Sequence, residues 1–506
     1  MPRVFPVWAV RCIVVLAAAL ATACGDSPTG PAIQRLAVLS GAGASDTVFA
    51  ILPNPLVVLV RDEAGMPALG VPVRFEVLRP AFPTNSVGAF LATNPERTGS
   101  GLVVIDTTDA NGESRIYVRL GTLGGPVQIV VDAPSLGLST STTFTVLPGA
   151  PTGVRVLPGD SAMYVGRSYN LRGAVIDRWG NARPDPVTYI STANTIVNVD
   201  GSGRLTGTAI GRRSIIVAAN AFRDTAFVSV VPEGMIATHK TRVSGADTAA
   251  VVFTNLDGSG YEVRPVVYWA QPRPDWSGSG DAIVIEDAGA LFGEEISRLV
   301  TMRHGDGSTV PLSSSPPAGN QFYPQYSADG EWIYFAEDPP GGGLDLWRVR
   351  ADGSGAERLG PQVSHGYNDT KPSASPDGGR VVFVSDRLCC SQSLFILHID
   401  SRAIDTLRSE TGANFYGDMP RWSPVDDDRI AYVDNRIWLT SASGGVQQAI
   451  TPAGKRYVGG IDWSPDGRWI IARSADDGFL HLIEVSTGLT LPLAFTGRLW
   501  SPAWRP

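Results

Sequence analysis

A phrase of the form P-x-W-S-P-D-G recurs along the C-terminal half of this 506-residue chain, and its spacing constrains the fold more than any other feature. Its six copies begin at Pro274, Pro324, Pro372, Pro420, Gly460 and Pro502. Successive copies start 50, 48, 48, 40 and 42 residues apart. A sequence that repeats every 40 to 50 residues or so is typical of a blade of four strands, and blades of this kind stack into a propeller.

Every copy but the third carries an aromatic residue, and three copies carry the full Asp-Gly pair. The aromatic residues are Trp276, Tyr326, Trp422, Trp463 and Trp504, and each is large enough to pack between neighbouring blades. The Asp-Gly pairs are Asp329-Gly330, Asp377-Gly378 and Asp466-Gly467, and each predicts a tight turn between two strands. Apolar strands follow the turns, for example at 331–337 and 344–350. Because no such blade can bury both faces alone, we expect the blades to surround a common axis.

The last copy, 502–506, supplies only a first strand. Strand-like segments within 235–267 supply the missing partners, so we predict that the two ends of 235–506 join in a sixth blade and remove the free sheet edges. The repeated phrase resembles that of TolB-like, WD-repeat-like propellers over about 270 residues. TolB carries an N-terminal α/β domain, whereas strand-rich modules precede the propeller here. The resemblance therefore does not imply TolB's partnership with the peptidoglycan-associated lipoprotein.

Two strand-rich segments, 33–148 and 152–232, precede the repeats, with a Pro-Gly linker between them. Short β-branched runs separated by turn residues predict a β-sandwich in each segment. The residues at 58–77 and 107–133 resemble the group 1, invasin/intimin type of bacterial Ig-like domain. The residues at 154–232 resemble the group 2 type. The predicted fold class is thus all-β: two Ig-like β-sandwiches followed by a six-bladed β-propeller.

The first 23 residues are typical of a signal peptide, with Arg3 and Arg11 near an apolar run that is too short to span a membrane. The run ends in Leu20-Ala21-Thr22-Ala23-Cys24, which resembles a bacterial lipobox, although Ala21 stands where leucine is usual. This resemblance implies that Cys24 is lipidated, that 24–32 form a tether, and that the membrane is a partner. The alternative is ordinary secretory cleavage beside an incidental cysteine. Gly25 lacks the aspartate that signals inner-membrane retention, so we expect an extracytoplasmic protein anchored to the outer membrane.

Charge and cysteine content narrow the function further. The formal net charge is −8 and no basic stripe is present, which disfavours a nucleic-acid partner. Apart from Cys12 and Cys24, the cysteines are Cys389 and Cys390, adjacent in sequence. They predict either a strained vicinal disulfide or two unpaired thiols. Zinc sites need more ligands, commonly in other spacing, so we expect no metal there.

We find no catalytic motif in the sequence. The G-x-S-x-G elbow of serine hydrolases is missing, and no phosphate-binding loop precedes a helix. The histidines are His239, His304, His365, His398 and His481, none in paired spacing. His398 and His481 fall in predicted strands, whereas His304 and His365 fall near turns and are candidates for the propeller mouth. The run Asp426-Asp427-Asp428 replaces an Asp-Gly turn and is expected to be solvated. We therefore expect no cofactor, metal or catalytic residue.

Two hypotheses remain. The first is a membrane-anchored, non-enzymatic scaffold whose propeller binds an envelope protein or a glycan. The second is an extracytoplasmic lyase or glycosidase that acts on glycans with loops over the propeller mouth. Paired carboxylates that are close in space cannot be recognised in the sequence, so the second hypothesis depends on which acidic side chains the fold brings together.

Overall fold

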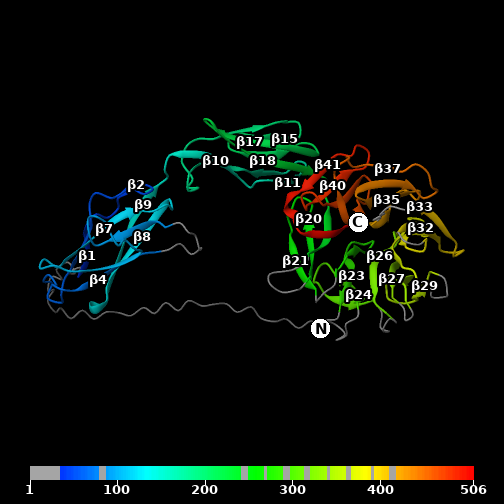
Figure 1. Cartoon of the computed structure of the whole chain (residues 1–506), viewed down its shortest axis with the longest axis horizontal. Coiled ribbons are helices and arrows are strands. Elements are labelled where there is room, and N and C mark those ends of the chain that lie inside the picture. Colours follow the sequence, from blue (N-terminus) through cyan, green and yellow to red (C-terminus); the bar gives the residue numbers. More distant parts are fainter. Residues whose placement is uncertain are drawn as a thin grey trace, which may run out of the picture. The chain divides into compact units, whose positions relative to one another are not determined.

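The structure is a computed structural model that describes residues 35–78, 87–240, 249–266, 271–288, 297–312, 319–338, 342–360, 366–388, 392–408 and 418–506. The predicted signal peptide, the tether with Cys24, His365 and the pair Cys389 and Cys390 lie outside these residues. The prediction of an all-β fold is confirmed: the described residues form strands and two three-residue 3-10 helices, without an α-helix (Figure 1). None of the helices among them is long and apolar enough to cross a membrane.

The first strand-rich segment is a two-layer sandwich. One sheet has the order β1 (Leu36–Ser40), β3 (Leu56–Val60), β7 (Glu113–Leu120), β5 (Ala89–Ala92). The other has the order β2 (Ser45–Thr47), β9 (Leu138–Leu147), β8 (Gly125–Ala133), β4 (Pro72–Val77), β6 (Val103–Thr107). Alternate residues of both sheets, such as Val58, Phe75 and Ile129, meet in one core. This period of two places one face of each strand in the core.

The second segment is built in the same way from shorter strands. Its largest sheet has the order β11 (Ser161–Tyr164), β18 (Phe222–Val231), β17 (Gly211–Ala219), β14 (Thr188–Ser191). Two smaller sheets pair β12 (Ser168–Asn170), β16 (Arg204–Gly207) and β15 (Val197–Val199), and β10 (Pro151–Leu157) with β13 (Arg172–Asp177). Leu171, Val197, Leu205 and Ile215 lie in their shared core.

Six four-stranded antiparallel sheets follow, which we number one to six from their first strands. Sheets one to three are β22 (Asp275–Trp276), β23 (Ala282–Ala288), β24 (Ser297–Arg303), β25 (Thr309–Pro311); β26 (Gln321–Tyr326), β27 (Trp332–Glu337), β28 (Asp345–Arg350), β29 (Glu357–Arg358); and β30 (Asp369–Ala374), β31 (Arg380–Ser385), β32 (Ser393–His398), β33 (Ile404–Arg408). Sheets four and five are β34 (Asp418–Trp422), β35 (Arg429–Asp434), β36 (Arg436–Ser441), β37 (Gln448–Ala449); and β38 (Tyr457–Trp463), β39 (Trp469–Ser474), β40 (Leu480–Glu484), β41 (Thr490–Leu493).

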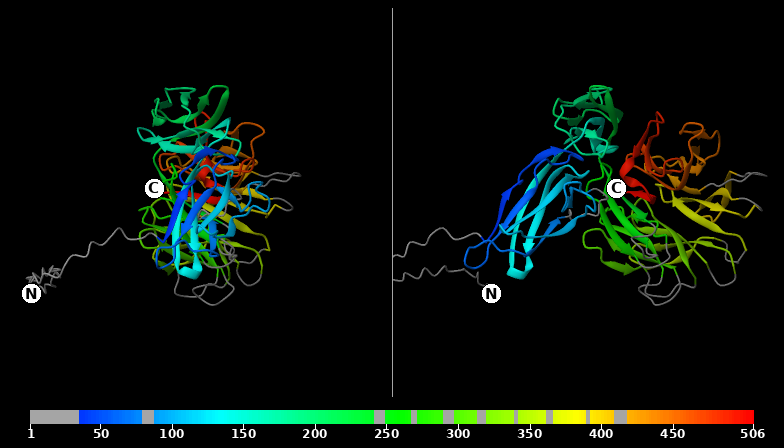
Figure 2. Two further views of the ribbon diagram at one scale, coloured as in Figure 1. Left: turned by 90° about the vertical axis from the view of Figure 1, so that its left-hand side faces the viewer. Right: turned by 60° about the vertical axis from the view of Figure 1, so that its left-hand side comes forward.

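Sheet six joins the two ends of this region. Its order is β42 (Leu499–Trp504), β19 (Met235–Lys240), β20 (Ala249–Asn255), β21 (Glu262–Val266), so the C-terminal strand pairs with strands more than 230 residues earlier. β19 and β42 are antiparallel, with Ala237 opposite Ala503. The sheets fan around an axis, as the green-to-red part of Figure 2 shows, and the first strands of all six sheets line one cavity on it. This arrangement is a β-propeller.

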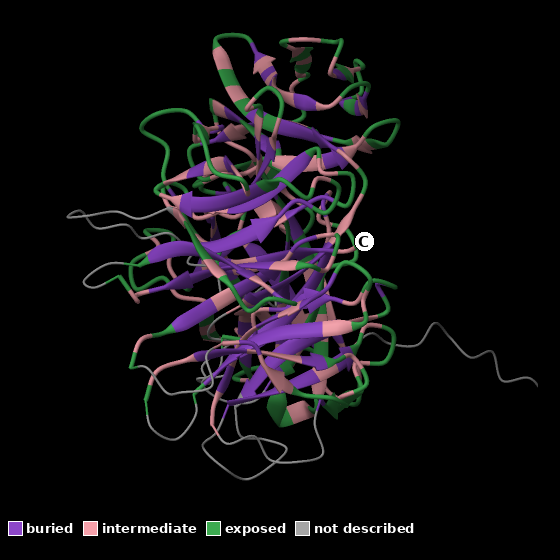
Figure 3. Cartoon of the chain, turned by 90° about the vertical axis from the view of Figure 1, so that its right-hand side faces the viewer, coloured by how far each residue is buried: buried purple, intermediate pink, exposed green. Residues whose placement is uncertain are grey.

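The aromatic residues of the repeated phrase lie between neighbouring sheets. Trp276 packs with Val251 and Phe253 of sheet six. Trp463 packs with Ala431 and Val433 of sheet four. Tyr326, Trp422 and Trp504 occupy the corresponding positions against sheets one, three and five. Figure 3 shows the result as buried strands with exposed turns at their ends.

The Asp-Gly pairs form the turns between first and second strands. Gly330, Gly378 and Gly467 have φ of 73°, 71° and 67°, a left-handed backbone that glycine adopts without steric cost. A serine two residues before each aspartate completes the turn. In sheet five, Ser464 Oγ donates to Asp466 (2.6 Å) and accepts from the backbone N–H of Trp469 (2.9 Å). This serine is part of the repeated phrase, but its role was not predicted.

The chain divides into two compact units, Met1–Ala150 with Asp177–Asn181, and Pro151–Ile176 with Ala182–Pro506. The second unit holds the second sandwich and the six sheets together. Ala162, Tyr164 and Ile210 of the sandwich pack against the core that contains Leu491, Leu493 and Trp504. Tyr164 Oη donates to the carbonyl of Gly234 (2.9 Å), and Ser229 Oγ donates to the carbonyl of Pro492 (3.1 Å).

Candidate functional site

A collar of six residues narrows the axis of the propeller. Each stands immediately before the first residue of a copy of the phrase: Arg273, Tyr323, Lys371, Met419, Gly459 and Ser501. All six have positive φ, between 34° and 75°, and register shifts interrupt strand pairing at this level in four sheets where the phrase begins. A left-handed backbone costs a non-glycine residue about 1 kcal/mol or more, so its repetition marks a position that the surrounding fold over-determines. The cavity at the collar is only about 10 Å³.

Cationic and aromatic side chains meet in the collar. The guanidinium carbon of Arg273 lies 4.3 Å from the ring centre of Tyr323, and Lys371 Nζ lies 5.8 Å from the same ring centre. Arg273 Nη1 is 3.1 Å from both carboxylate oxygens of Glu286. Glu286 Oε1 also accepts from the backbone N–H of Tyr323 (2.7 Å). Burial raises the pKa of Glu286, and the charge of Arg273 opposes that rise.

A second ring lies one step further along each first strand, between the start of the phrase and its aromatic residue. We call it the polar ring, and its members are Asp275, Gln325, Ser373, Arg421, Asp462 and Ala503. Three of them accept a backbone N–H from the next sheet. Tyr326 N donates to Asp275 Oδ2 (2.8 Å), Trp422 N to Ser373 Oγ (2.9 Å), and Trp504 N to Asp462 Oδ2 (2.7 Å). These bonds fix the side chains and satisfy buried backbone donors.

Arg421 crosses the axis and joins the two aspartates. Its Nη2 lies 3.3 Å from Asp275 Oδ1, and its Nε lies 4.0 Å from Asp462 Oδ1. Nε also donates to the carbonyl of Ile461 (3.2 Å). The Gln325 amide, oriented to suit its neighbours, donates to the carbonyl of Pro372 (2.9 Å) and accepts from Arg421 Nη1.

The two carboxylates thus share a single guanidinium in a buried site. Asp275 and Arg421 are each only 7% exposed. Burial raises the pKa of both Asp275 and Asp462, the charge of Arg421 opposes this, and Asp462 raises the pKa of Asp275 further. The physical cause is that two like charges with one counter-charge are removed from water.

The polar ring is the floor of a cavity of about 270 Å³ that opens at the Asp-Gly turns, which we call the axial funnel. Asp275, Gln325 and Asp462 line its floor. Its walls are the five aromatic residues of the phrase, Trp276, Tyr326, Trp422, Trp463 and Trp504. Ala328 and Pro424 lie among the residues nearer its rim. Every one of the six sheets contributes, so the fold itself creates this cavity.

Two larger hollows lie on the same part of the chain, but they are shallower in character. One, of about 660 Å³, is lined by Asp426, Asp428 and neighbours from sheets four and five. The other, of about 550 Å³, lies between sheets one and two beside Asp281 and Asp352. Their acidic groups belong to exposed turns, where serine hydroxyls lower the pKa of Asp281, Asp352 and Asp428. The funnel is the better candidate, because its polar groups are buried and convergent.

The described histidines lie away from the funnel lining. The ring of His304, a candidate for the mouth, packs 4.8 Å from Phe253 and 5.5 Å from Trp276, between sheets six and one. His398 Nε2 is 2.8 Å from Asp405 on the surface. His239 in β19 is 2% exposed, and burial lowers its pKa to about 3, with Arg273 and Arg473 adding to the effect.

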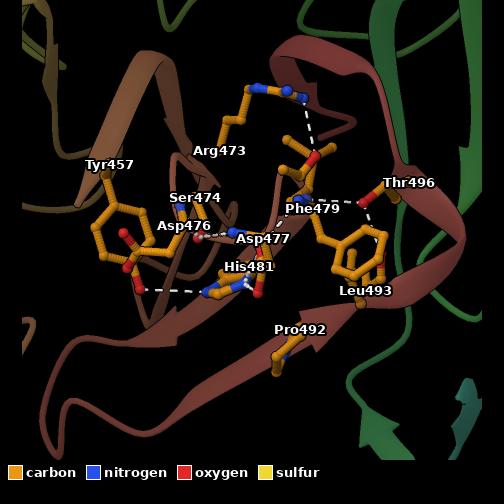
Figure 4. A network of polar contacts seen from close by, with 12 residues as sticks. Tyr457, Arg473, Ser474, Asp476, Asp477, Phe479, His481, Pro492, Leu493 and Thr496 are labelled. Atoms are coloured by element: carbon orange, nitrogen blue, oxygen red, sulfur yellow. Dashed lines mark hydrogen bonds and ion pairs between the residues drawn. The ribbon is translucent and has the colours of Figure 1, made fainter. Parts of the chain in front are cut away.

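His481 belongs to a buried network in sheet five (Figure 4). Its Nε2 is 2.9 Å from Asp477 Oδ2, and its Nδ1 is 3.3 Å from Tyr457 Oη. Burial raises the pKa of Tyr457 to about 12 and lowers that of His481. Although this order of groups resembles a proton relay, His481 is 4% exposed and none of the three lines the funnel, so we assign the network to packing.

No signal of metal binding is found among the described side chains: no three His, Cys, Asp or Glu residues gather closely enough to hold an ion. The polar ring was not predicted as a site. Its signal was nevertheless present, because the second residue of the phrase changes from copy to copy while its neighbours repeat.

No protein-family model matches the chain. An uncharacterised protein of Agrobacterium fabrum is 38% identical over 117 residues, which are 22% of this chain and 38% of that protein. The chain thus spans well under half the length of this relative. Among solved structures, TolB from Acinetobacter baumannii is similar with a TM-score of 0.43 and 16% identity, over 63% of this chain and 83% of that one. An oligogalacturonate lyase in complex with manganese has a TM-score of 0.35 and 14% identity, over 52% and 74%. Structural neighbours therefore include TolB-like propeller proteins.

Proposed function

We propose that this chain is an extracytoplasmic binding protein, held to a membrane by lipid on Cys24, that binds a protein or glycan ligand in the axial funnel and catalyses no reaction. In this proposal 33–148 and 152–232 are the Ig-like domains and 235–506 is a six-bladed propeller. One observation carries the binding role: all six sheets converge on a preformed cavity with aromatic walls and a polar floor. Such a cavity is the usual form of a ligand site.

The rigidity of the floor supports binding. Asp275 and Asp462 each accept a backbone N–H and both face Arg421, so their orientation is set before a ligand arrives. Binding to a preorganised site avoids the entropy of ordering side chains. The sandwiches act as spacers that hold the propeller away from the membrane.

The second candidate is a glycan-active enzyme, favoured by the same two carboxylates. Their raised pKa and their position at the base of an aromatic funnel are features that a glycosidase or lyase would use. The purified chain incubated with envelope polysaccharides separates the candidates. Release of shortened or unsaturated sugars, lost in Asp275→Asn, would establish the enzyme.

A retention experiment tests the binding role. Detergent-solubilised envelope is passed over immobilised wild-type protein and over Ala328→Trp, which places a large side chain in the funnel from an exposed position. The matched control is Ala356→Trp, at an exposed position on an outer turn. We expect Ala328→Trp alone to lose the retained ligand at least 10-fold. Equal retention by all three proteins would contradict a funnel site.

The anchor is tested separately. Cys24→Ala should move the protein from the membrane fraction to the soluble fraction of disrupted cells, because each acyl chain contributes about 0.8 kcal/mol per buried methylene. A protein that still sediments with membranes after this change would refute the lipid anchor.

A further inference from the structure

The polar ring contains two carboxylates and one cation, and its two sides differ in charge. Asp275 and Asp462 line the axial funnel, whereas Arg421 lines the small cavity on the collar side, together with Arg273 and Lys371. The collar side is therefore rich in cations, and the funnel side presents carboxylates. This separation follows from the side chains at two successive positions of the same strands.

Sheet six creates the imbalance. The even-numbered sheets two and four contribute donors at the ring position, and both reach a carbonyl of the next sheet. Gln325 donates to the carbonyl of Pro372, and Arg421 donates to that of Ile461. The equivalent residue of sheet six is Ala503, which has only a methyl group and stands between the sheets that carry Asp462 and Asp275.

The ring thus carries one more negative than positive charge, and it is largely removed from water. Arg421 serves both aspartates, at 3.3 Å from Asp275 but only 4.0 Å from Asp462. A buried carboxylate without a full partner is costly, and a bound cation would remove that cost.

The walls of the funnel suit the same kind of ligand. Five aromatic side chains surround the approach to the two carboxylates. Aromatic faces attract cations, and their apolar surface packs against an alkyl chain. The volume of about 270 Å³ is enough for one long side chain and part of its backbone.

We propose that the funnel binds a ligand through a primary ammonium group, such as an exposed lysine side chain of a partner protein, which lies between Asp275 and Asp462 with its alkyl chain against the aromatic walls. This assignment rests on the funnel being the binding site of the proposed function. An ammonium group has three donors, which two carboxylates and neighbouring carbonyls can accept. Two carboxylates are too few oxygen ligands for calcium, which takes six to eight or so.

Binding of this kind depends on pH with a definite sign. The ammonium group needs ionised carboxylates, and the groups that act on Asp275 are Arg421, which favours its charge, and Asp462, which opposes it. Arg421 likewise favours the charge of Asp462. Affinity is therefore full in mildly alkaline solution and falls as the pH is lowered and these carboxylates take up protons.

The test compares two probes on the full chain: Nα-acetyl-lysine methylamide and Nα-acetyl-norleucine methylamide, which has a similar stem without the ammonium group. We expect titration calorimetry to show at least 10-fold tighter binding of the lysine probe at pH 8, declining by pH 5.5. Asp462→Asn should abolish this preference, and its amide oxygen can still accept from Trp504 N, so the fold is preserved. Asp352→Asn, on an exposed turn, is the matched control.

The outcomes are distinguishable from those of the retention experiment. Equal binding of both probes, an effect of Asp352→Asn equal to that of Asp462→Asn, or a pH-independent preference would overturn the ammonium assignment. If the lysine probe fails to bind while Ala328→Trp still abolishes retention of the envelope ligand, the ammonium assignment falls and the proposed function stands. If the probe fails and Ala328→Trp has no effect, both fall.

Discussion

At the scale of single residues, the repeated phrase separates structure from chemistry. Its aromatic and Asp-Gly positions repeat because every sheet needs the same packing and the same turn. Its second position, occupied by residues as different as Asp275, Arg421 and Ala503, varies because it faces the axis. Sequence periodicity identified the repeating positions. The pairing of Asp275 with Arg421 joins positions 146 residues apart in different sheets (421 against 275), so it could not be predicted.

His239 gives a prediction at this scale. Its pKa is lowered to about 3 in the folded protein, against about 6.5 when unfolded, so folding favours the neutral ring. The stabilisation is complete above about pH 6.5 and is lost as the pH falls toward 3. Between pH 7.5 and 5 the loss is up to about 2 kcal/mol.

The measurement is urea unfolding followed by tryptophan fluorescence at both pH values. His239→Gln should remove most of this pH dependence, while His398→Gln, at a surface position, should retain it. An identical pH dependence in wild type and His239→Gln would show that the buried ring is not the cause.

At the scale of strands and sheets, the interface between neighbouring blades is the main stabilising contact. Trp463 is 4% exposed, packs against sheet four, and donates from Nε1 to the carbonyl of Arg421 (3.1 Å). The sequence allowed this packing to be predicted, because a large aromatic residue recurs at the same place in successive repeats. The register shifts beside the collar were not predictable, since nothing in the residue types at Tyr323 or Lys371 favours positive φ.

We expect Trp463→Ala to lower the free energy of unfolding by about 3 to 5 kcal/mol, because it leaves a cavity and an unpaired carbonyl. Tyr261→Ala, at a residue that is 44% exposed, should change it by less than about 1 kcal/mol. Guanidinium unfolding curves of both variants measure the difference. Comparable losses would argue that the interfaces between sheets are not limiting for stability.

At the scale of the whole molecule, the second sandwich and the propeller behave as one compact unit. Their boundary near residue 232 was recognisable in sequence from the change of repeat pattern. Their shared core was not, because Tyr164 and Ile210 meet Leu491 and Leu493 across nearly 300 residues of chain.

This contact predicts cooperative unfolding. Val231 is fully buried in the shared core, so Val231→Ala should lower the melting temperature of sandwich and propeller together. Differential scanning calorimetry, with hydrogen exchange to assign each transition, checks this. If only one of the two parts melts earlier in Val231→Ala, the shared core does not couple them.

The central claim, that a ligand occupies the axial funnel, is tested most directly by photo-crosslinking in cells. A photoreactive phenylalanine analogue replaces Ala328 at the funnel or Ala356 on the outer turn. The account predicts a discrete crosslinked species from position 328 that is absent from position 356. Crosslinks from position 356 alone, or equal crosslinking from both, would contradict it.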